Sequence, residues 1–139
     1  MDNEKKQKLI YLVIMVETAI LGILPLTGIF KAAKSQSRII IYVFFAIAII
    51  EMVFIHFFRK VAGDLAIERI RNSDDVNKEK KISRTRFNVN IVTWAVASAS
   101  AIYGVVAGFL GGNRYDFYML WSFAILSLLL YPPKSSENP

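Results

Sequence analysis

A chain of 139 residues, 55% of them hydrophobic, carries more apolar surface than a soluble domain of this size can bury. Its net charge is +6, but the basic residues flank apolar segments and form no stripe with interleaved aromatic residues, which argues against nucleic acid as a partner. The absence of cysteine excludes disulfide bonds, thiolate metal sites and cysteine nucleophiles.

Four apolar segments follow one another along the chain, each near the roughly 20 residues that a helix needs to cross a bilayer. They are residues 9–30, 39–58, 89–110 and 115–131. The first is longer than the apolar region of a signal peptide, about 7–15 residues, so we expect it to be retained. The last stops at Pro132 and Pro133, which end helices. The sequence predicts an all-α, polytopic membrane protein: a single domain, residues 1–139, that forms a four-helix transmembrane bundle.

Residues 59–88 are the longest polar segment and are expected to form a loop on one side of the membrane. Residues 61–71 contain few helix breakers, so the second helix is expected to continue beyond the membrane and to end near residues 72–75. Residues 76–86 are strongly charged. We interpret them as a solvated linker, with a site for anionic lipid or a protein partner as the alternative.

The distribution of Lys and Arg predicts the orientation. Thirteen of them precede the first segment, separate the second from the third, or follow the fourth, and only four lie in the two other loops. Because basic residues accumulate in cytoplasmic loops, both termini and the 59–88 loop are expected in the cytoplasm, with the chain in the plasma membrane.

Two short stretches are alike, Ala19-Ile20-Leu21-Gly22 and Ala101-Ile102-Tyr103-Gly104. Each opens a predicted helical hairpin, so the bundle is interpreted as two repeated hairpins, with coincidental small-residue packing as the alternative. With the preceding Glu17, the first stretch resembles the ion-carrying helix of rotary ATPase proteolipids, the c-type subunits. The resemblance implies an oligomeric ring with a proton or sodium site at Glu17. The chain departs from the family in helix order, in the Ala99 that replaces a second Glu, and in the length of the 59–88 loop.

Glu17 and Glu51 are the ionisable residues most deeply placed in the predicted spans, and such residues are functional candidates by default. They lie roughly 12 Å and roughly 10 Å from the cytoplasmic ends of their segments, and Ser98 reaches a comparable level. Close carboxyl groups in a low dielectric share a proton or bind a cation. One hypothesis is therefore a proton or ion site at Glu17, Glu51 and Ser98. The other is that each carboxyl group is hydrogen bonded and fixes helix packing.

Small residues recur at every fourth position of the third segment: Ser100, Gly104, Gly108 and Gly112. They share one helix face, which lets another helix approach closely. We expect the partner within the chain, near Gly22 of the first helix, with a second copy of the chain as the alternative. The single histidine, His56, excludes a bis-histidine haem within one chain.

The sequence contains no nucleotide-binding, hydrolase or metal-binding motif. We therefore expect a protein that is not an enzyme and needs no cofactor. The favoured interpretation is an accessory subunit or self-associating scaffold whose partners are the lipid bilayer and other membrane subunits or further copies. The alternative is a small proton- or cation-coupled transporter or channel that uses its membrane carboxylates.

Overall fold

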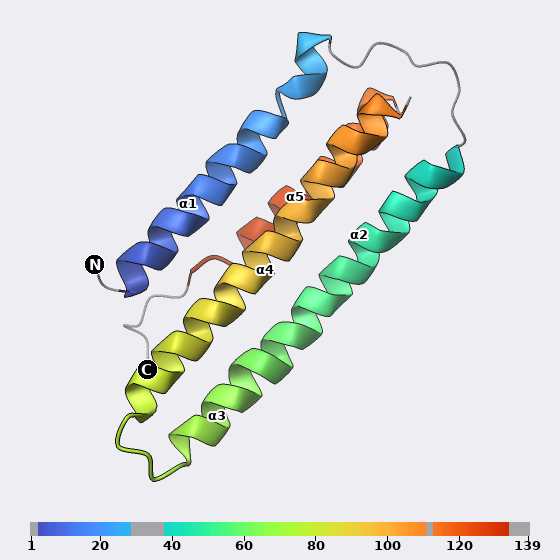
Figure 1. Ribbon diagram of the computed structural model, residues 1–139. Helices are drawn as coiled ribbons and strands as arrows, with labels where there is room; N and C mark the ends of the chain where they lie inside the picture. The colour runs from blue at the N-terminus through green and yellow to red at the C-terminus, as the bar shows by residue number, and fades with distance from the viewer. Residues whose placement is uncertain (1–2, 29–37, 111–112, 134–139) are drawn as a thin grey trace.

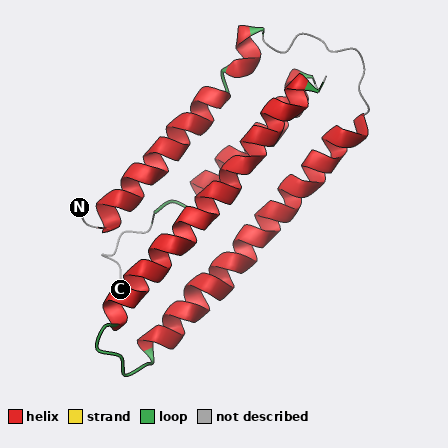
Figure 2. Ribbon diagram, viewed as in Figure 1, coloured by secondary structure: helices red, strands yellow, loops and turns green. Residues whose placement is uncertain are grey.

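The computed structural model describes residues 3–28, 38–110 and 113–133, and every regular element in these ranges is a helix (Figures 1 and 2). The prediction of an all-α fold is confirmed. The α-helices are α1 Asn3–Leu21, α2 Arg38–Phe58, α3 Ala66–Arg71, α4 Lys78–Phe109 and α5 Arg114–Leu130. Two shorter elements are the 3₁₀ turn η1, Leu24–Thr27, and the π-helix η2, Arg59–Leu65.

Three helical stretches within the described residues are long and apolar enough to cross a membrane: Asn3–Thr27, Arg38–Arg71 and Lys78–Phe109. α5 follows the predicted fourth segment closely, but it has only 17 residues. Its length of about 26 Å is below the roughly 30 Å of a hydrocarbon core. The membrane character therefore rests on the three longer stretches, and the crossing by α5 stays a prediction.

The long helix α4 is the centre of the bundle. It packs most extensively on α5, and α1 and α2 flank it on opposite sides (Figure 1). The start of α1, the turn between α3 and α4, and the end of α5 all lie at one end of the bundle, which we call the inner end.

Close approach between α5 and its neighbours is achieved at two glycines. A Cβ atom added at Gly104 would lie 3.1 Å from the backbone oxygen of Phe117, and one added at Gly22 would lie 2.8 Å from the ring of Trp121. At Gly104 the small-residue face of α4 thus meets α5, whereas the first helix was expected there. Gly108 is buried on the same helix, and Gly112 lies outside the described residues.

The first helix is shorter than predicted. α1 ends at Leu21, and η1 continues the chain to Thr27. Pro25 has no amide proton for a helical hydrogen bond, and Gly28, with φ of 73°, adopts the left-handed conformation that closes helices.

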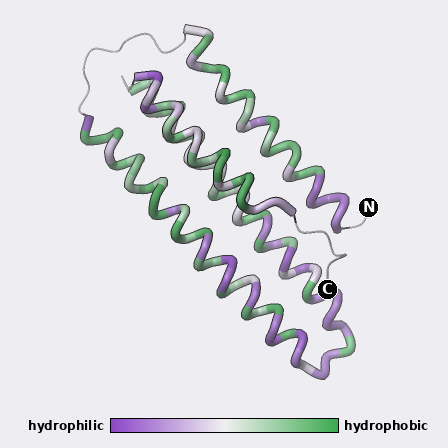
Figure 3. Tube along the Cα trace, turned by 180° about the vertical axis from the view of Figure 1, so that it is seen from behind, coloured by the Kyte–Doolittle hydropathy of each residue, from purple (hydrophilic) through white to green (hydrophobic). Residues whose placement is uncertain are grey.

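The segment between the second and third predicted spans is mostly helical. α2 runs on through η2 and α3 to Arg71, so the predicted continuation is confirmed. The interpretation of residues 76–86 as a linker was wrong, because α4 already begins at Lys78. The Asp75 carboxylate accepts hydrogen bonds from the Asn77 amide and from Lys81, which stabilises the first turn of α4. Hydrophilic residues dominate this hairpin (Figure 3).

The buried face of α2 shifts by one residue as it passes into η2. Ile41, Ala48 and Ile55 are buried at a regular spacing of seven, but the next buried residue is Gly63, eight positions after Ile55. A π-helix widens the turn and accommodates one extra residue without breaking the helix. η2 therefore keeps Gly63 against Val89 of α4 and turns the face of α3 relative to α2.

Candidate functional site

Glu51 is bound by two hydroxyl groups of α4. The Tyr103 hydroxyl donates to its Oε1 at 2.7 Å, and Ser100 Oγ donates to its Oε2 at 3.2 Å. The Tyr103 ring stacks on Phe44 of α2 with ring centroids 5.6 Å apart, which fixes the position of its hydroxyl. Both carboxyl oxygens of Glu51 thus have a partner on the adjacent helix. Ser100, predicted as a packing residue, serves as a ligand of this carboxyl group.

Glu17 has the opposite environment. It is exposed on α1, on the far side of α4 from α2, and it makes no hydrogen bond or ion pair with any described residue. The neighbouring apolar side chains are also 50–58% exposed: Val13, Val16 and Ile20. Since α1 and α2 flank α4, the structure does not bring Glu17 and Glu51 together.

Ser98 is separated from both carboxyl groups by its position around the helix. Its Oγ donates to the backbone oxygen of Ala95 within α4, at 3.0 Å. Ser98 lies two residues before Ser100, and residues two apart do not share a helix face. Of the three residues predicted to form one polar site, only Glu51 belongs to a polar group between helices, and its partners there are Ser100 and Tyr103.

A second polar group lies at the inner end, where we define the Arg59 junction as Gln7, Arg59, Asn90, Thr93 and Tyr131. The Arg59 guanidinium donates to Asn90 Oδ1 at 3.1 Å and to Thr93 Oγ1 at 3.5 Å. Asn90 Nδ2 donates in turn to Gln7 Oε1 at 3.2 Å. The guanidinium also lies 4.9 Å from the ring centre of Tyr131, a cation–π contact. The junction links α1, η2, α4 and the end of α5.

Two aromatic donors bind the carbonyl groups at the end of α5. Trp94 Nε1 donates to the backbone oxygen of Tyr131 at 2.8 Å, and the Tyr11 hydroxyl donates to that of Leu128 at 2.9 Å. The last carbonyls of a helix have no partner within it, so these bonds fix where α5 stops.

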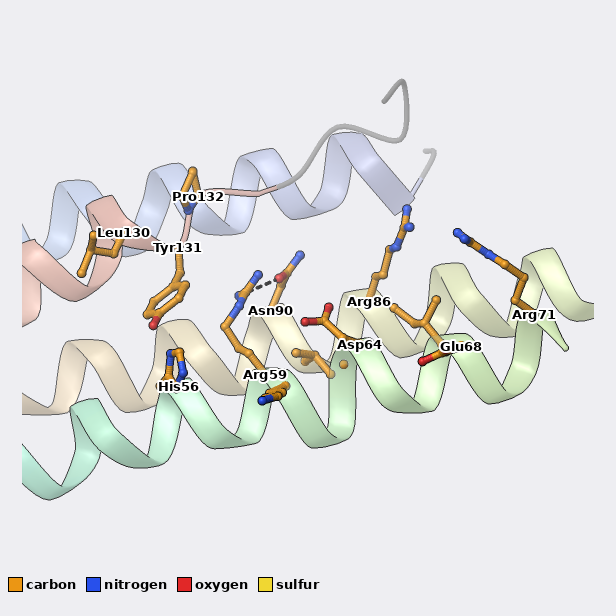
Figure 4. A pocket seen from close by; sticks show the side chains of 14 residues that line it. His56, Arg59, Asp64, Glu68, Arg71, Arg86, Asn90, Leu130, Tyr131 and Pro132 are labelled. Atoms are coloured by element: carbon orange, nitrogen blue, oxygen red, sulfur yellow. Dashed lines mark hydrogen bonds between the residues drawn. The ribbon is translucent and has the colours of Figure 1, made fainter. Parts of the chain in front are cut away.

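A cavity of about 960 Å³ lies beside the junction, between α2, η2 and α3 on one side and α4 on the other (Figure 4). Its charged lining residues are Arg59, Lys60, Asp64, Glu68, Arg71 and Arg86, and His56 lies at the end near Tyr131. Basic residues outnumber acidic ones here. Within the described part of the chain, no three His, Asp or Glu side chains lie close enough to hold a metal ion.

Sequence reasoning missed the Arg59 junction and the cavity. A signal was present: Asn90 and Thr93 are three residues apart, at the start of an apolar segment, and so share one helix face. Two polar residues on one face of a membrane helix indicate an interhelical hydrogen bond. Arg59 could not be assigned as their partner, because the π-helical turn that places it is not visible in the sequence pattern.

Comparison with known proteins returned no relative: the chain matches no protein-family model, no curated protein and no solved structure.

Proposed function

We propose that this is a non-enzymatic, four-span protein of the cell membrane that acts as a self-associating scaffold, with the outer face of α1 as its contact surface. The observation that carries the proposal is Glu17, which is exposed among apolar side chains and has no partner among the described residues. An ionisable group that faces hydrocarbon is costly, so it is expected to face a polar group of another helix.

A second copy of the chain supplies such a group by symmetry. All copies insert with the same orientation, so a two-fold axis along the membrane normal places each residue at the same depth as its equivalent. Two α1 helices in contact would bring two Glu17 carboxyl groups together, and a pair of carboxyl groups in low dielectric can share one proton. The resemblance to proteolipids, which also implies an oligomer, agrees with this proposal.

The orientation belongs to the same proposal. Lys5, Lys6 and the many basic residues of α3 and the first turns of α4 lie at the inner end. The positive-inside rule assigns that end to the cytoplasm, together with both termini.

The absence of cysteine allows a direct test of the contact. A single cysteine replaces Val13, beside Glu17 on α1, and the control replaces Ile50, which is 65% exposed on α2. Oxidation by copper phenanthroline in proteoliposomes is expected to cross-link Val13→Cys into dimers and to leave Ile50→Cys monomeric. Adding Glu17→Leu is expected to reduce the dimer at least threefold, whereas Glu17→Gln retains it because the amide still forms a hydrogen-bonded pair.

Equal cross-linking from both positions, or a dimer that is indifferent to Glu17→Leu, would contradict the scaffold. A Val13→Cys adduct that forms in native membranes with another protein, and never with a second copy, would instead identify an accessory subunit.

The second candidate function is proton- or cation-coupled transport, and the contacts of Glu51 favour it. A carboxyl group between the hydroxyls of Ser100 and Tyr103 can exchange a proton without losing its hydrogen-bond partners. The test is proton flux into proteoliposomes that contain a pH-sensitive dye. Flux that is lost in Glu51→Gln and kept in Glu17→Gln would establish transport, and absence of flux above protein-free liposomes would exclude proton transport.

A further inference from the structure

The cavity at the inner end arises from unequal helix lengths. α5 ends at Leu130, whereas α2 continues through η2 to Arg71 and α4 begins at Lys78, well beyond the end of α5. Past that point, residues 130–132 are the only described residues outside the segment from α2 to α4 that line the cavity between α3 and α4 (Figure 4). Two helices with a partial cover leave a cleft where the rest of the bundle has a filled core.

The charged groups of this cleft favour an anion. Arg59, Lys60, Arg71 and Arg86 line it, against two acidic residues, Asp64 and Glu68. None of the four basic side chains forms an ion pair within 4.0 Å with a described residue. Arg59 is already oriented by Asn90, so its charge is held at the wall of the cavity. A phosphate group accepts charge-assisted hydrogen bonds from such side chains.

The cavity also spans the boundary between apolar and polar parts of the bundle. The apolar sequence of α2 ends at Phe58, and Arg59 is the next residue. Leu130 lies at the end of the cavity next to the apolar part of the bundle, whereas Arg71 and Arg86 lie toward the polar end (Figure 4). A molecule in this place meets hydrocarbon at one end and water at the other. The cavity volume of about 960 Å³ is at the upper end of the range for small-ligand sites.

From these contacts we infer that the cavity binds the headgroup of an anionic phospholipid, with the phosphate against Arg59, Lys60 and Arg86. Asp64 and Glu68 accept hydrogen bonds from hydroxyl groups of the headgroup, so phosphatidylglycerol is the matching chemistry. The acyl chains leave the cavity toward the apolar part of α2. Basic pockets between membrane helices on the cytoplasmic side bind anionic headgroups in this manner. The inference does not depend on self-association.

The test measures lipid binding to the full chain in neutral detergent by native mass spectrometry, with dioleoylphosphatidylglycerol as the probe. Lys60→Gln combined with Arg86→Gln removes two charges from the cavity. Lys78→Gln combined with Lys80→Gln removes two charges from the exposed start of α4 and is the matched control. We expect the cavity variant to raise the Kd about tenfold and the control to raise it less than about twofold.

Three outcomes would overturn the inference. Equal losses in the two variants would show that general surface charge attracts the lipid. Equally tight binding of dioleoylphosphatidylcholine would show that the cavity does not recognise an anionic headgroup. Displacement of the lipid by glycerol 3-phosphate at the same concentration would show that a soluble phosphate ester is the ligand. Where the double variant fails to fold, Lys60→Gln alone, exposed on η2, gives the same test with one charge.

Discussion

The α4–α5 interface and the Arg59 junction hold helices together by opposite means. At the interface, Gly104 allows the backbone of α5 to come within contact distance, and apolar side chains fill the remaining space. At the junction, polar side chains of different helices are joined by hydrogen bonds, and a cavity lies beside them. In hydrocarbon there is no water, and therefore no hydrophobic driving force between helices. Close packing is then the main source of helix association. At the inner end, hydrogen bonds between side chains join the helices, and a cavity lies next to them.

The largest effect is expected where the interface is closest. Gly104→Leu inserts a large side chain against the backbone of Phe117, which cannot move aside, so we expect a loss of about 3 kcal/mol in unfolding free energy. The measurement is reversible unfolding in mixed detergent and dodecyl sulfate, followed by far-ultraviolet circular dichroism.

The matched pair for this prediction is Gly104→Ala and Gly63→Ala. A Cβ atom at Gly104 meets an oxygen at 3.1 Å, whereas one at Gly63 meets Val89 Cγ1 at an ordinary 3.5 Å. We expect Gly104→Ala to destabilise by about 1 kcal/mol and Gly63→Ala to be neutral or stabilising by up to about 1 kcal/mol. Equal destabilisation by the two would remove the contrast between the interface and the inner end.

The next effect concerns the centre of the junction. Arg59→Met leaves Asn90 Oδ1 without this donor and removes the cation–π contact with Tyr131, so we expect a loss of about 2 kcal/mol. Lys60→Met, at the next position and exposed, should change stability by less than about 0.5 kcal/mol. The same unfolding assay measures both. If Arg59→Met lowers the unfolding free energy no more than Lys60→Met does, the junction does not stabilise the inner end.

The two carboxylates offer a third contrast. Glu51→Ala leaves the hydroxyls of Ser100 and Tyr103 without their acceptor, and we expect it to cost about 1–2 kcal/mol. Glu51→Gln keeps one acceptor oxygen and should recover part of the loss. Glu17→Ala removes no hydrogen bond or ion pair with a described residue and should leave the unfolding free energy of the monomer unchanged within about 0.5 kcal/mol. A larger cost for Glu17→Ala would show that Glu17 has a role within the monomer.

The smallest effect lies in the turn before α4. The hydrogen bond from Lys81 and that from the Asn77 amide lower the pKa of Asp75 below its ordinary value of 3.8. A group whose pKa is lowered by folding stabilises the fold above its unfolded pKa, and this contribution is lost as the pH falls through the folded pKa. The melting temperature of the wild type is therefore expected to fall slightly more below pH 4 than that of Asp75→Asn. Parallel pH profiles would contradict the assignment.

The sequence predicted where the helices lie along the chain well, but it predicted poorly which side of each helix packs on which neighbour. The bounds of α2 and α5 lie within one residue of the predicted segments, because apolar runs and the Pro132-Pro133 stop are local signals. The helical rise predicts how far Glu17 and Glu51 lie from the ends of their segments. Depth, however, does not say on which side of α4 a residue lies. For this reason the two carboxylates were expected in one layer, and Ser98 was chosen in place of Tyr103.

The inner end was the least predictable part. α4 begins earlier than its apolar segment, since a turn that begins at Asp75 starts the helix regardless of hydrophobicity. The extra residue that η2 accommodates changes which side chains face α4, and no local sequence signal marks it. Tertiary contacts at Gly63 and Arg59 decide that geometry.

The short length of α5 has a consequence for the membrane itself. If α5 crosses the bilayer, its 17 residues cover about 26 Å, several ångströms less than an average hydrocarbon core. Lipids next to α5 must then compress, while those next to α2 do not, so the thickness of the surrounding bilayer differs from one side of the protein to the other. Such a mismatch costs fractions of a kcal/mol per ångström and favours membranes, or membrane regions, that are already thin. The helix that ends early would thereby influence where in a cell the protein accumulates.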